Sequence, residues 1–142
     1  AVCVTAENHD VLCNPAEKAS LDPKWLEKAI EKARQEAIRR RKVYLGDRPR
    51  PNVGGKIAIV VDDGVATGMT FLMALKEARH LKPAKLIAAI PVLPAEMVER
   101  LKKEADEVVY LDAPEDFLGA VGSYYDQFPQ VTDEEVIKLL TT

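Results

Sequence analysis

The sequence predicts an α/β fold with a central, mostly parallel sheet flanked by helices, and with a β-hairpin at the N-terminus. Strand-like and helix-like segments alternate from Lys56 onwards, which is the order of consecutive βαβ units. Apolar residues make up 47% of the 142 residues, enough to build a core of ordinary size. Right-handed crossovers between such strands predict helices on both faces of the sheet.

The N-terminal segment predicts the hairpin and then a long helix. Residues 1–5 and 10–14 are short apolar runs separated by turn-forming residues. The dipeptide Asp22-Pro23 is a helix-start signal, and apolar residues recur at helical spacing after it. Four consecutive basic residues at 39–42 suit the negative end of a helix dipole, so the helix is expected to end there and a proline-rich loop to follow.

The second half of the chain predicts the parallel sheet. Residues 57–61 are all apolar and mostly β-branched, which indicates a strand buried on both faces. Similar runs predict strands over residues 85–92 and 107–111. Helices are predicted over residues 69–81 and 94–105, and a capping box at residues 132–135 begins a last helix.

Glycine and hydroxyl residues gather directly after the strand 57–61, where ligands of parallel sheets bind. Gly64 and Gly68 permit backbone conformations closed to other residues and a close approach by a ligand. Thr67 and Thr70 offer hydroxyl donors at the start of the next helix, whose free N–H groups favour an anion. The residues predicted to hold a phosphate group are Gly64, Val65, Ala66, Thr67, Gly68, Met69 and Thr70.

Two adjacent carboxylates, Asp62 and Asp63, precede this loop. Carboxylates beside a phosphate site would repel the phosphate unless another part of the ligand lay between them. A ribose 5-phosphate fits this arrangement, because its hydroxyls can donate hydrogen bonds to Asp62 and Asp63. Carboxylates near the sugar would also favour positive charge at the anomeric carbon, so these two residues are the candidate catalytic groups.

Other phosphate motifs do not fit the spacing. A Walker A loop requires lysine where this chain has Met69, and the glycines are too far apart for the dinucleotide fingerprint. The alternative to a binding site is a solvated turn that begins the next helix. The combination of two acids, Thr67-Gly68 and Thr70 between a buried strand and a helix favours the binding site.

Residues 57–70 resemble the phosphoribosyl-pyrophosphate (PRPP) motif of the type I phosphoribosyltransferases: a hydrophobic strand, two acids, a small loop ending in Thr-Gly, and a further threonine. The chain is similar in particular to a group of uncharacterised bacterial and archaeal proteins assigned to this family. That similarity extends over nearly the whole chain and includes residues 1–14, 48–49, 92–94, 104–108 and 124–128.

The resemblance implies transfer of the 5-phosphoribosyl group from PRPP to a nitrogenous base, with Mg²⁺ bound through PRPP rather than directly by the protein. It implies that Asp62 and Asp63 bind the ribose hydroxyls and that the loop 64–70 wraps the 5-phosphate. Hypoxanthine-type members carry an aspartate where this chain has Ala66, which disfavours a 6-oxopurine acceptor. Tyr125 and Phe128 are candidates for stacking on the base.

The family usually begins with a further strand, a pyrophosphate-binding loop and a helix. Residues 1–142 are therefore expected to form a single phosphoribosyltransferase-like domain, truncated at its N-terminus, that lacks this unit. We expect a homodimer or association with the N-terminal segment. A non-catalytic module that binds a nucleotide or ribose phosphate is the alternative function, and a scaffold with a relic motif is the third.

Composition excludes other classes of protein. The net charge is −3, which argues against a nucleic-acid-binding protein, because phosphate backbones require a basic surplus. No apolar run is long enough to span a membrane, and no signal-peptide pattern is present, so a cytoplasmic protein is expected. The basic cluster 39–42 could reach pyrophosphate, or it could be a solvated helix end.

Overall fold

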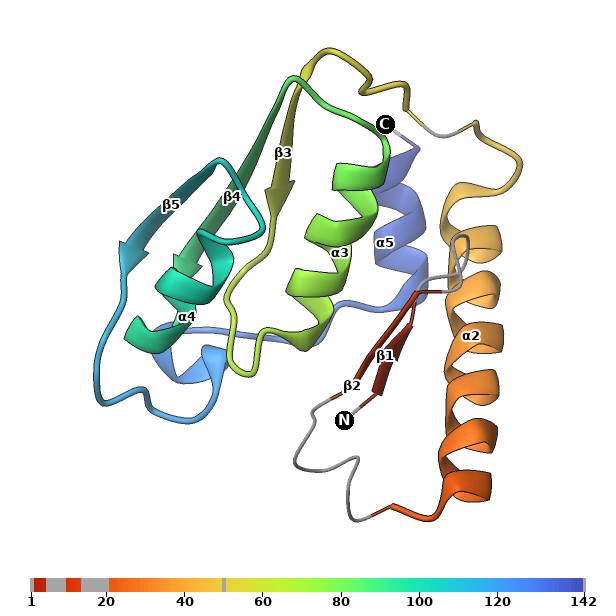
Figure 1. Cartoon of the computed structure of the whole chain (residues 1–142), viewed down its shortest axis with the longest axis horizontal. Helices are drawn as coiled ribbons and strands as arrows, with labels where there is room; N and C mark the ends of the chain where they lie inside the picture. Colours follow the sequence, from red (N-terminus) through yellow and green to blue (C-terminus); the bar gives the residue numbers. More distant parts are fainter. Residues whose placement is uncertain (1, 5–9, 14–20, 50, 142) are drawn as a thin grey trace. The chain divides into compact units, whose positions relative to one another are not determined.

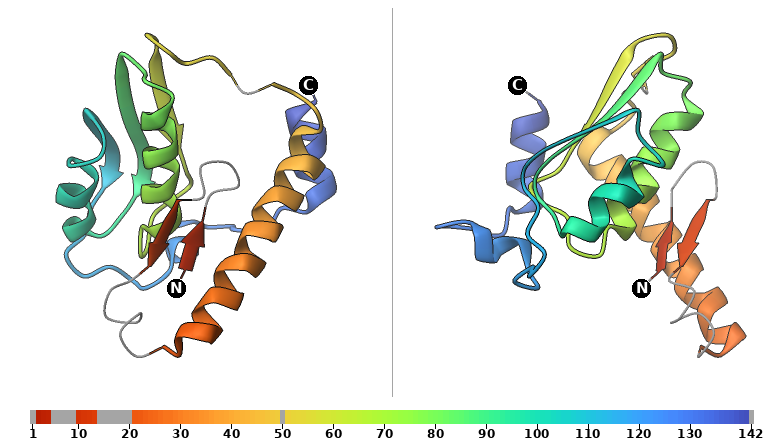
Figure 2. Two further views of the ribbon diagram at one scale, coloured as in Figure 1. Left: turned by 45° about the vertical axis from the view of Figure 1, so that its right-hand side comes forward. Right: turned by 60° about the vertical axis from the view of Figure 1, so that its left-hand side comes forward.

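The computed structural model describes residues 2–4, 10–13, 21–49 and 51–141. The chain divides into two compact units, which we describe separately: unit 1 is Ala1–Pro51 with Pro129–Thr142, and unit 2 is Asn52–Phe128. Figures 1 and 2 show the helices and strands of both units. The expectation of a single domain over residues 1–142 stays a prediction. Among the described residues, no helix has the length and apolar character needed to cross a membrane.

Unit 1 begins with the two predicted N-terminal strands. Strand β1 (Val2–Val4) pairs antiparallel with β2 (Val11–Cys13), with Cys3 opposite Leu12. Both described strands lie within the predicted runs, residues 1–5 and 10–14. The turn expected between them lies outside the described residues.

Helix α2 (Pro23–Leu45) starts as predicted but ends later. The Asp22 side chain caps it by accepting a 2.9 Å hydrogen bond from the Trp25 N–H. The basic residues 39–42 lie within the helix, so the predicted end there was wrong. The helix instead ends at Gly46, whose φ of 57° is open to glycine and whose N–H bonds to the Lys42 carbonyl. The position of Gly46, rather than that of the basic cluster 39–42, therefore determines where the helix ends.

Helix α5 (Asp133–Leu140) begins with the predicted capping box, in which Thr132 and Glu135 each bond the other's backbone N–H. Tyr44 of α2 and Arg48 of the loop that follows α2 contact its two ends. The Tyr44 hydroxyl donates to Asp133 Oδ1 at 2.5 Å, and Arg48 Nη1 donates to the Leu140 carbonyl at 2.6 Å. The C-terminal helix is therefore part of unit 1 through specific polar contacts.

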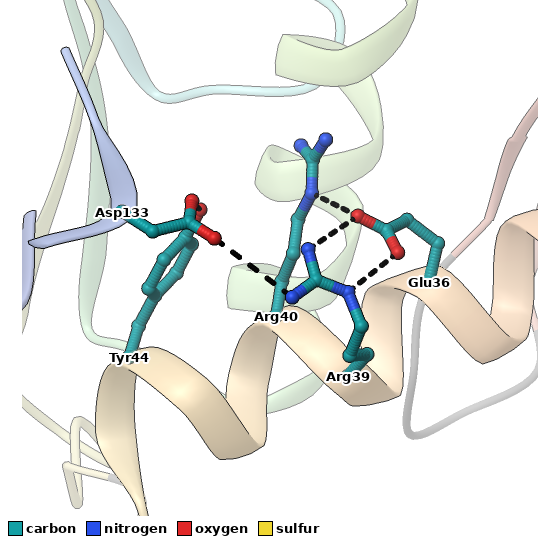
Figure 3. Close-up of polar contacts among 5 residues, drawn as sticks. All are labelled: Glu36, Arg39, Arg40, Tyr44 and Asp133. Carbon is teal, nitrogen blue, oxygen red and sulfur yellow. Dashed lines mark hydrogen bonds and ion pairs between the residues drawn. The ribbon is translucent and has the colours of Figure 1, made fainter.

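The basic cluster of α2 is partly neutralised by Glu36. Figure 3 shows the Glu36 carboxylate between the guanidinium groups of Arg39 and Arg40, and each Arg Nε lies 2.8 Å from a carboxylate oxygen. The hydrogen bond from Arg39, followed by that from Arg40, lowers the pKa of Glu36 to about 2. Arg39 also lies 3.8 Å from Asp133 of α5. These contacts stabilise the helix surface and the α2–α5 pair.

Unit 2 contains the predicted parallel sheet. Strands β3 (Ile57–Val61), β4 (Lys85–Val92) and β5 (Glu107–Asp112) are all parallel and lie in the order β3-β4-β5 (Figure 1). Helix α3 (Met69–His80) connects β3 to β4, and α4 (Ala95–Leu101) connects β4 to β5. The α/β fold with a parallel sheet and flanking helices is confirmed. Helix α4 is shorter than predicted.

The helices of unit 2 cover one face of this sheet (Figures 1 and 2), so the prediction of helices on both faces is wrong for the described residues of this unit. Alternate residues of β4 from Leu86 to Val92 are buried with the inner sides of α3 and α4. Ile57, Ile59 and Val61 of β3 face the opposite side and are 63%, 58% and 70% exposed. The expectation that this strand is buried on both faces is therefore wrong for the described residues. The order β3-β4-β5 explains this, because two right-handed crossovers that step in the same direction place both helices on one face.

Candidate functional site

The candidate site lies on the segment 62–70, which joins the carboxyl end of β3 to the start of α3 (Figure 1). Two backbone hydrogen bonds fix this segment to the neighbouring strand. The Asp62 N–H donates to the Ala89 carbonyl at 3.3 Å, and the Val65 N–H donates to the Val92 carbonyl at 3.0 Å. The turn between Asp62 and Val65 is therefore held over the carboxyl end of the sheet, where ligands of such folds bind.

Both glycines of the motif are required by their surroundings. Gly68 has a φ of 75°, and a Cβ there would lie 2.1 Å from Cε of the buried Met97. A Cβ on Gly64 would lie 2.3 Å from Cγ1 of Val121. Since Gly68 precedes α3 and has no side chain to cap it, the N–H groups of the first helical turn stay open to a ligand.

A cavity of about 260 Å³ opens at this turn. It is somewhat smaller than a typical small-molecule site of about 300–1,000 Å³, which suits a small polar group. Eight of the nine predicted site residues line it, together with Phe71. These eight are Asp62, Gly64, Val65, Ala66, Thr67, Gly68, Met69 and Thr70. Asp63, the ninth, does not line this cavity, and both Asp62 and Asp63 are exposed as whole residues.

Asp62 has the perturbed carboxyl of the site. Partial burial raises its pKa, and the adjacent Asp63 carboxylate acts in the same direction. A hydrogen bond from the Asp63 N–H to Asp62 Oδ1, 3.0 Å long, opposes this rise. A carboxyl group that is partly desolvated next to a set of helix N–H groups can interact strongly with a donor on a bound ligand.

A segment for which the sequence analysis predicts no helix or strand packs against the turn from outside. We call residues 121–128 the strap; it begins with a 3₁₀ helix, η1 (Val121–Tyr124). The Tyr125 hydroxyl donates to the Asp63 carbonyl at 2.5 Å, and Val121 contacts Gly64. Sequence patterns offer little sign of such contacts, because the strap has neither strand nor helix periodicity.

The two aromatic residues predicted to stack on a base lie in the strap. The rings of Tyr125 and Phe128 contact each other with centroids 5.1 Å apart. Tyr124 stacks on Phe117 at 5.2 Å, and its hydroxyl accepts a hydrogen bond from the Leu118 N–H. Stacking of Tyr125 or Phe128 on a base stays a prediction.

A second, larger cavity shares a wall with the first. Its volume is about 680 Å³, and Ala66 and Thr67 line both cavities. The remaining lining residues come from the region after β4 and from the loop after β5. They are Pro94, Ala95, Glu96, Glu115, Asp116, Phe117 and Gly119. Unit 2 thus has space for a second reactant directly beside the space at the start of α3.

The described residues contain no group of three or more His, Cys, Asp or Glu side chains suited to hold a metal ion. The carboxylates of Asp62 and Asp63 are hard oxygen donors of the kind that Mg²⁺ accepts. Since Mg²⁺ commonly takes one or two carboxylates and completes its shell with water and substrate phosphates, this donor set fits an ion carried by a phosphorylated ligand.

No family model matches the chain. Two proteins of Mycobacterium tuberculosis, “Putative phosphoribosyl transferase MT0597” of strain CDC 1551 / Oshkosh and “Putative phosphoribosyl transferase Rv0571c” of strain ATCC 25618 / H37Rv, are each 38% identical to it over 120 residues. The matched segment covers 84% of this chain, and this chain spans about a quarter (27%) of each relative.

The crystal structure of TT1426 from Thermus thermophilus is similar to 92% of this chain, with a TM-score of 0.73 and 38% sequence identity, and the match covers 62% of that protein. This similarity confirms the predicted fold class. The names of the two mycobacterial relatives confirm the resemblance to the phosphoribosyltransferases.

Proposed function

We propose that unit 2 binds the 5-phosphoribosyl group of PRPP and that the protein transfers this group to a nitrogenous acceptor with release of pyrophosphate. One observation carries the proposal: a single cavity brings the Asp62 carboxyl, the uncapped first turn of α3 and the threonines of the motif together. Phosphate suits the helix start, and a sugar diol suits the carboxyl. The names of the relatives support the same class of reaction.

The 5-phosphate would accept hydrogen bonds from the first N–H groups of α3 and from the hydroxyls of Thr67 and Thr70. The ribose hydroxyls would donate to Asp62, and Asp63 would be the second acceptor on the same turn. This arrangement leaves the anomeric carbon on the side of the carboxylates. Attack by an acceptor nitrogen would form the N–C bond as the C–O bond to pyrophosphate breaks, and the carboxylates would stabilise the positive charge on the sugar.

Mg²⁺, bound through PRPP, would neutralise the pyrophosphate and assist its departure. The acceptor would occupy the second cavity, because Ala66 and Thr67 form the wall that the two cavities share. Holding the two reactants side by side on one rigid loop supplies the proximity that a displacement reaction requires.

The direct test measures pyrophosphate release from PRPP and Mg²⁺ with a panel of nitrogenous bases. Calorimetry with ribose 5-phosphate measures the binding step alone. Asp62→Asn should weaken ribose 5-phosphate binding by roughly tenfold or more, since a hydrogen bond to a charged group contributes about 1.5–3 kcal/mol. Asp112→Asn is the matched control: Asp112 also lies at the carboxyl end of a strand, and it lines neither cavity.

The outcomes separate three possibilities. Binding with turnover supports the transferase. Saturable binding without turnover on any base indicates the alternative, a module that senses a ribose phosphate or nucleotide. Absence of ribose 5-phosphate binding, or equal effects of Asp62→Asn and Asp112→Asn, would contradict the proposed function.

A further inference from the structure

The turn that carries the two acids is fixed to the sheet at its ends but not in its middle. The N–H groups of Asp62 and Val65 bond to carbonyls of β4, 3.3 and 3.0 Å away. For the peptide between them, which joins Asp63 to Gly64, the described backbone hydrogen bonds include none to β4. The orientation of that peptide decides where the Asp63 side chain points and how the chain enters the phosphate loop.

The strap holds this middle peptide. The Tyr125 hydroxyl donates a 2.5 Å hydrogen bond to the Asp63 carbonyl, which is the oxygen of the peptide in question. Val121 packs directly against Gly64, so close that an added Cβ would lie 2.3 and 2.8 Å from its two methyl carbons. Two residues of the strap therefore contact two consecutive residues of the turn, one by a hydrogen bond and one by packing.

The strap is itself well braced. The Phe128 ring lies 5.1 Å from that of Tyr125, and it also contacts Gly122, where an added Cβ would lie 3.0 Å from Phe128 Cδ1. A tyrosine has few rotatable bonds, and this ring is held by a neighbour, so little conformational entropy opposes its hydrogen bond. Because Tyr125 is held in place by Phe128, its hydrogen bond can hold the turn in one position.

We propose that Tyr125 is a positioning residue for ribose recognition: its hydroxyl sets the orientation of the Asp63–Gly64 peptide and thereby places the acids against the sugar diol. The inference rests on the proposed function. In this inference the strap affects recognition of the sugar, and the start of α3 binds the phosphate. Among the described hydrogen bonds, Tyr125 makes none to the start of α3.

The test compares two ligands on the full chain. Calorimetry measures binding of ribose 5-phosphate, which needs both ends of the site, and of inorganic phosphate, which needs the helix start alone. Tyr125→Phe removes the hydroxyl and keeps the ring. It should weaken ribose 5-phosphate binding by roughly fivefold, the effect of one hydrogen bond, and change phosphate binding by less than about twofold.

Tyr124→Phe is the matched control, because it removes a neighbouring hydroxyl that accepts a hydrogen bond from the Leu118 N–H and makes none of the described hydrogen bonds to the turn. It should leave ribose 5-phosphate affinity within about twofold of the unmodified chain. Amide hydrogen exchange at Gly64 gives a second measurement that needs no ligand: Tyr125→Phe should accelerate it and Tyr124→Phe should not.

A ribose 5-phosphate affinity that is the same for the Tyr125→Phe and Tyr124→Phe variants would overturn the inference while the proposed function stood. Equal weakening of both ligands by Tyr125→Phe would also overturn it, since that result indicates a general structural role. An unmodified chain that binds neither ligand would refute the proposed function, and the positioning role with it.

Discussion

Replacing Gly68 by alanine should destabilise unit 2 for two separable reasons. The residue has a φ of 75°, a left-handed conformation that costs a residue with a Cβ about 1–2 kcal/mol. The new methyl would also lie 2.1 Å from Cε and 3.1 Å from Sδ of Met97, which is 1% exposed. Overpacking of this kind typically costs about 1–3 kcal/mol. The two effects together should lower the free energy of unfolding by about 3 kcal/mol.

Gly55→Ala is the control that isolates the backbone effect. Gly55 has a similar φ of 69°, but an added Cβ there meets no atom within 4 Å. Its replacement should therefore cost only the conformational part, about 1–2 kcal/mol. Urea unfolding followed by circular dichroism measures both variants under the same conditions.

A double-mutant cycle isolates the steric part. Met97→Ala alone should be destabilising, because it empties a fully buried position. Combined with Gly68→Ala it should cost less than the sum of the single changes, since the clash with Met97 is gone. Additive effects in the cycle, or equal losses for Gly68→Ala and Gly55→Ala, would refute the claim that a clash with Met97 adds to the backbone cost of a Cβ at this position.

Three further predictions concern carboxyl groups. Burial raises the pKa of Asp62, so the folded state holds this proton more tightly than the unfolded chain does. The free energy of unfolding should therefore fall as pH rises above the usual pKa of 3.8. Asp62→Asn should reduce this fall, as measured by urea unfolding at a series of pH values. The pKa of Glu36 is lowered from 4.5 to about 2, so its contribution to the stability of the folded state should be present above pH 4.5 and lost as pH falls towards 2. An NMR titration of the Glu36 carboxyl group should find its midpoint near 2. Asp106→Asn should destabilise unit 2 more than Glu107→Gln in thermal unfolding, because Asp106 accepts two 3.1 Å bonds from Arg79 and a backbone N–H bond, whereas Glu107 pairs with one exposed lysine.

The elements with strong local signals were predictable. The cap of α2 at Asp22 and the capping box of α5 depend on side chains within three residues of the helix start, and both are present. The strands and helices of unit 2 follow the predicted alternation closely. The candidate phosphate loop could be proposed for the same reason, because its glycines, threonines and acids occupy one continuous segment.

Features that depend on contacts between distant segments were not predictable. A run of apolar residues in β3 gives no indication of how many of its faces have a partner, and one face proves exposed at Ile57, Ile59 and Val61. The charge cluster 39–42 resembled a helix end, but Glu36 accommodates two of its arginines within α2. Ion pairs between residues three and four positions apart can form whether the helix ends at residues 39–42 or continues through them, so the sequence does not distinguish the two cases.

The strap shows why the candidate site could be predicted from the sequence more readily than the residues that pack against it. Gly64 is a visible signal, since glycine permits close contacts that other residues do not, yet the neighbouring sequence gives no indication that Val121 is the residue in contact. The residue that makes a motif glycine necessary is distant in sequence and ordinary in type. Met97, which packs at Gly68, and Tyr125, which donates a hydrogen bond to the Asp63 carbonyl, are likewise distant in sequence from the residues that they contact. A sequence motif of this kind therefore shows the residues on one side of a packed contact, and the residues on the other side, which hold the motif in place, are found only in the structure.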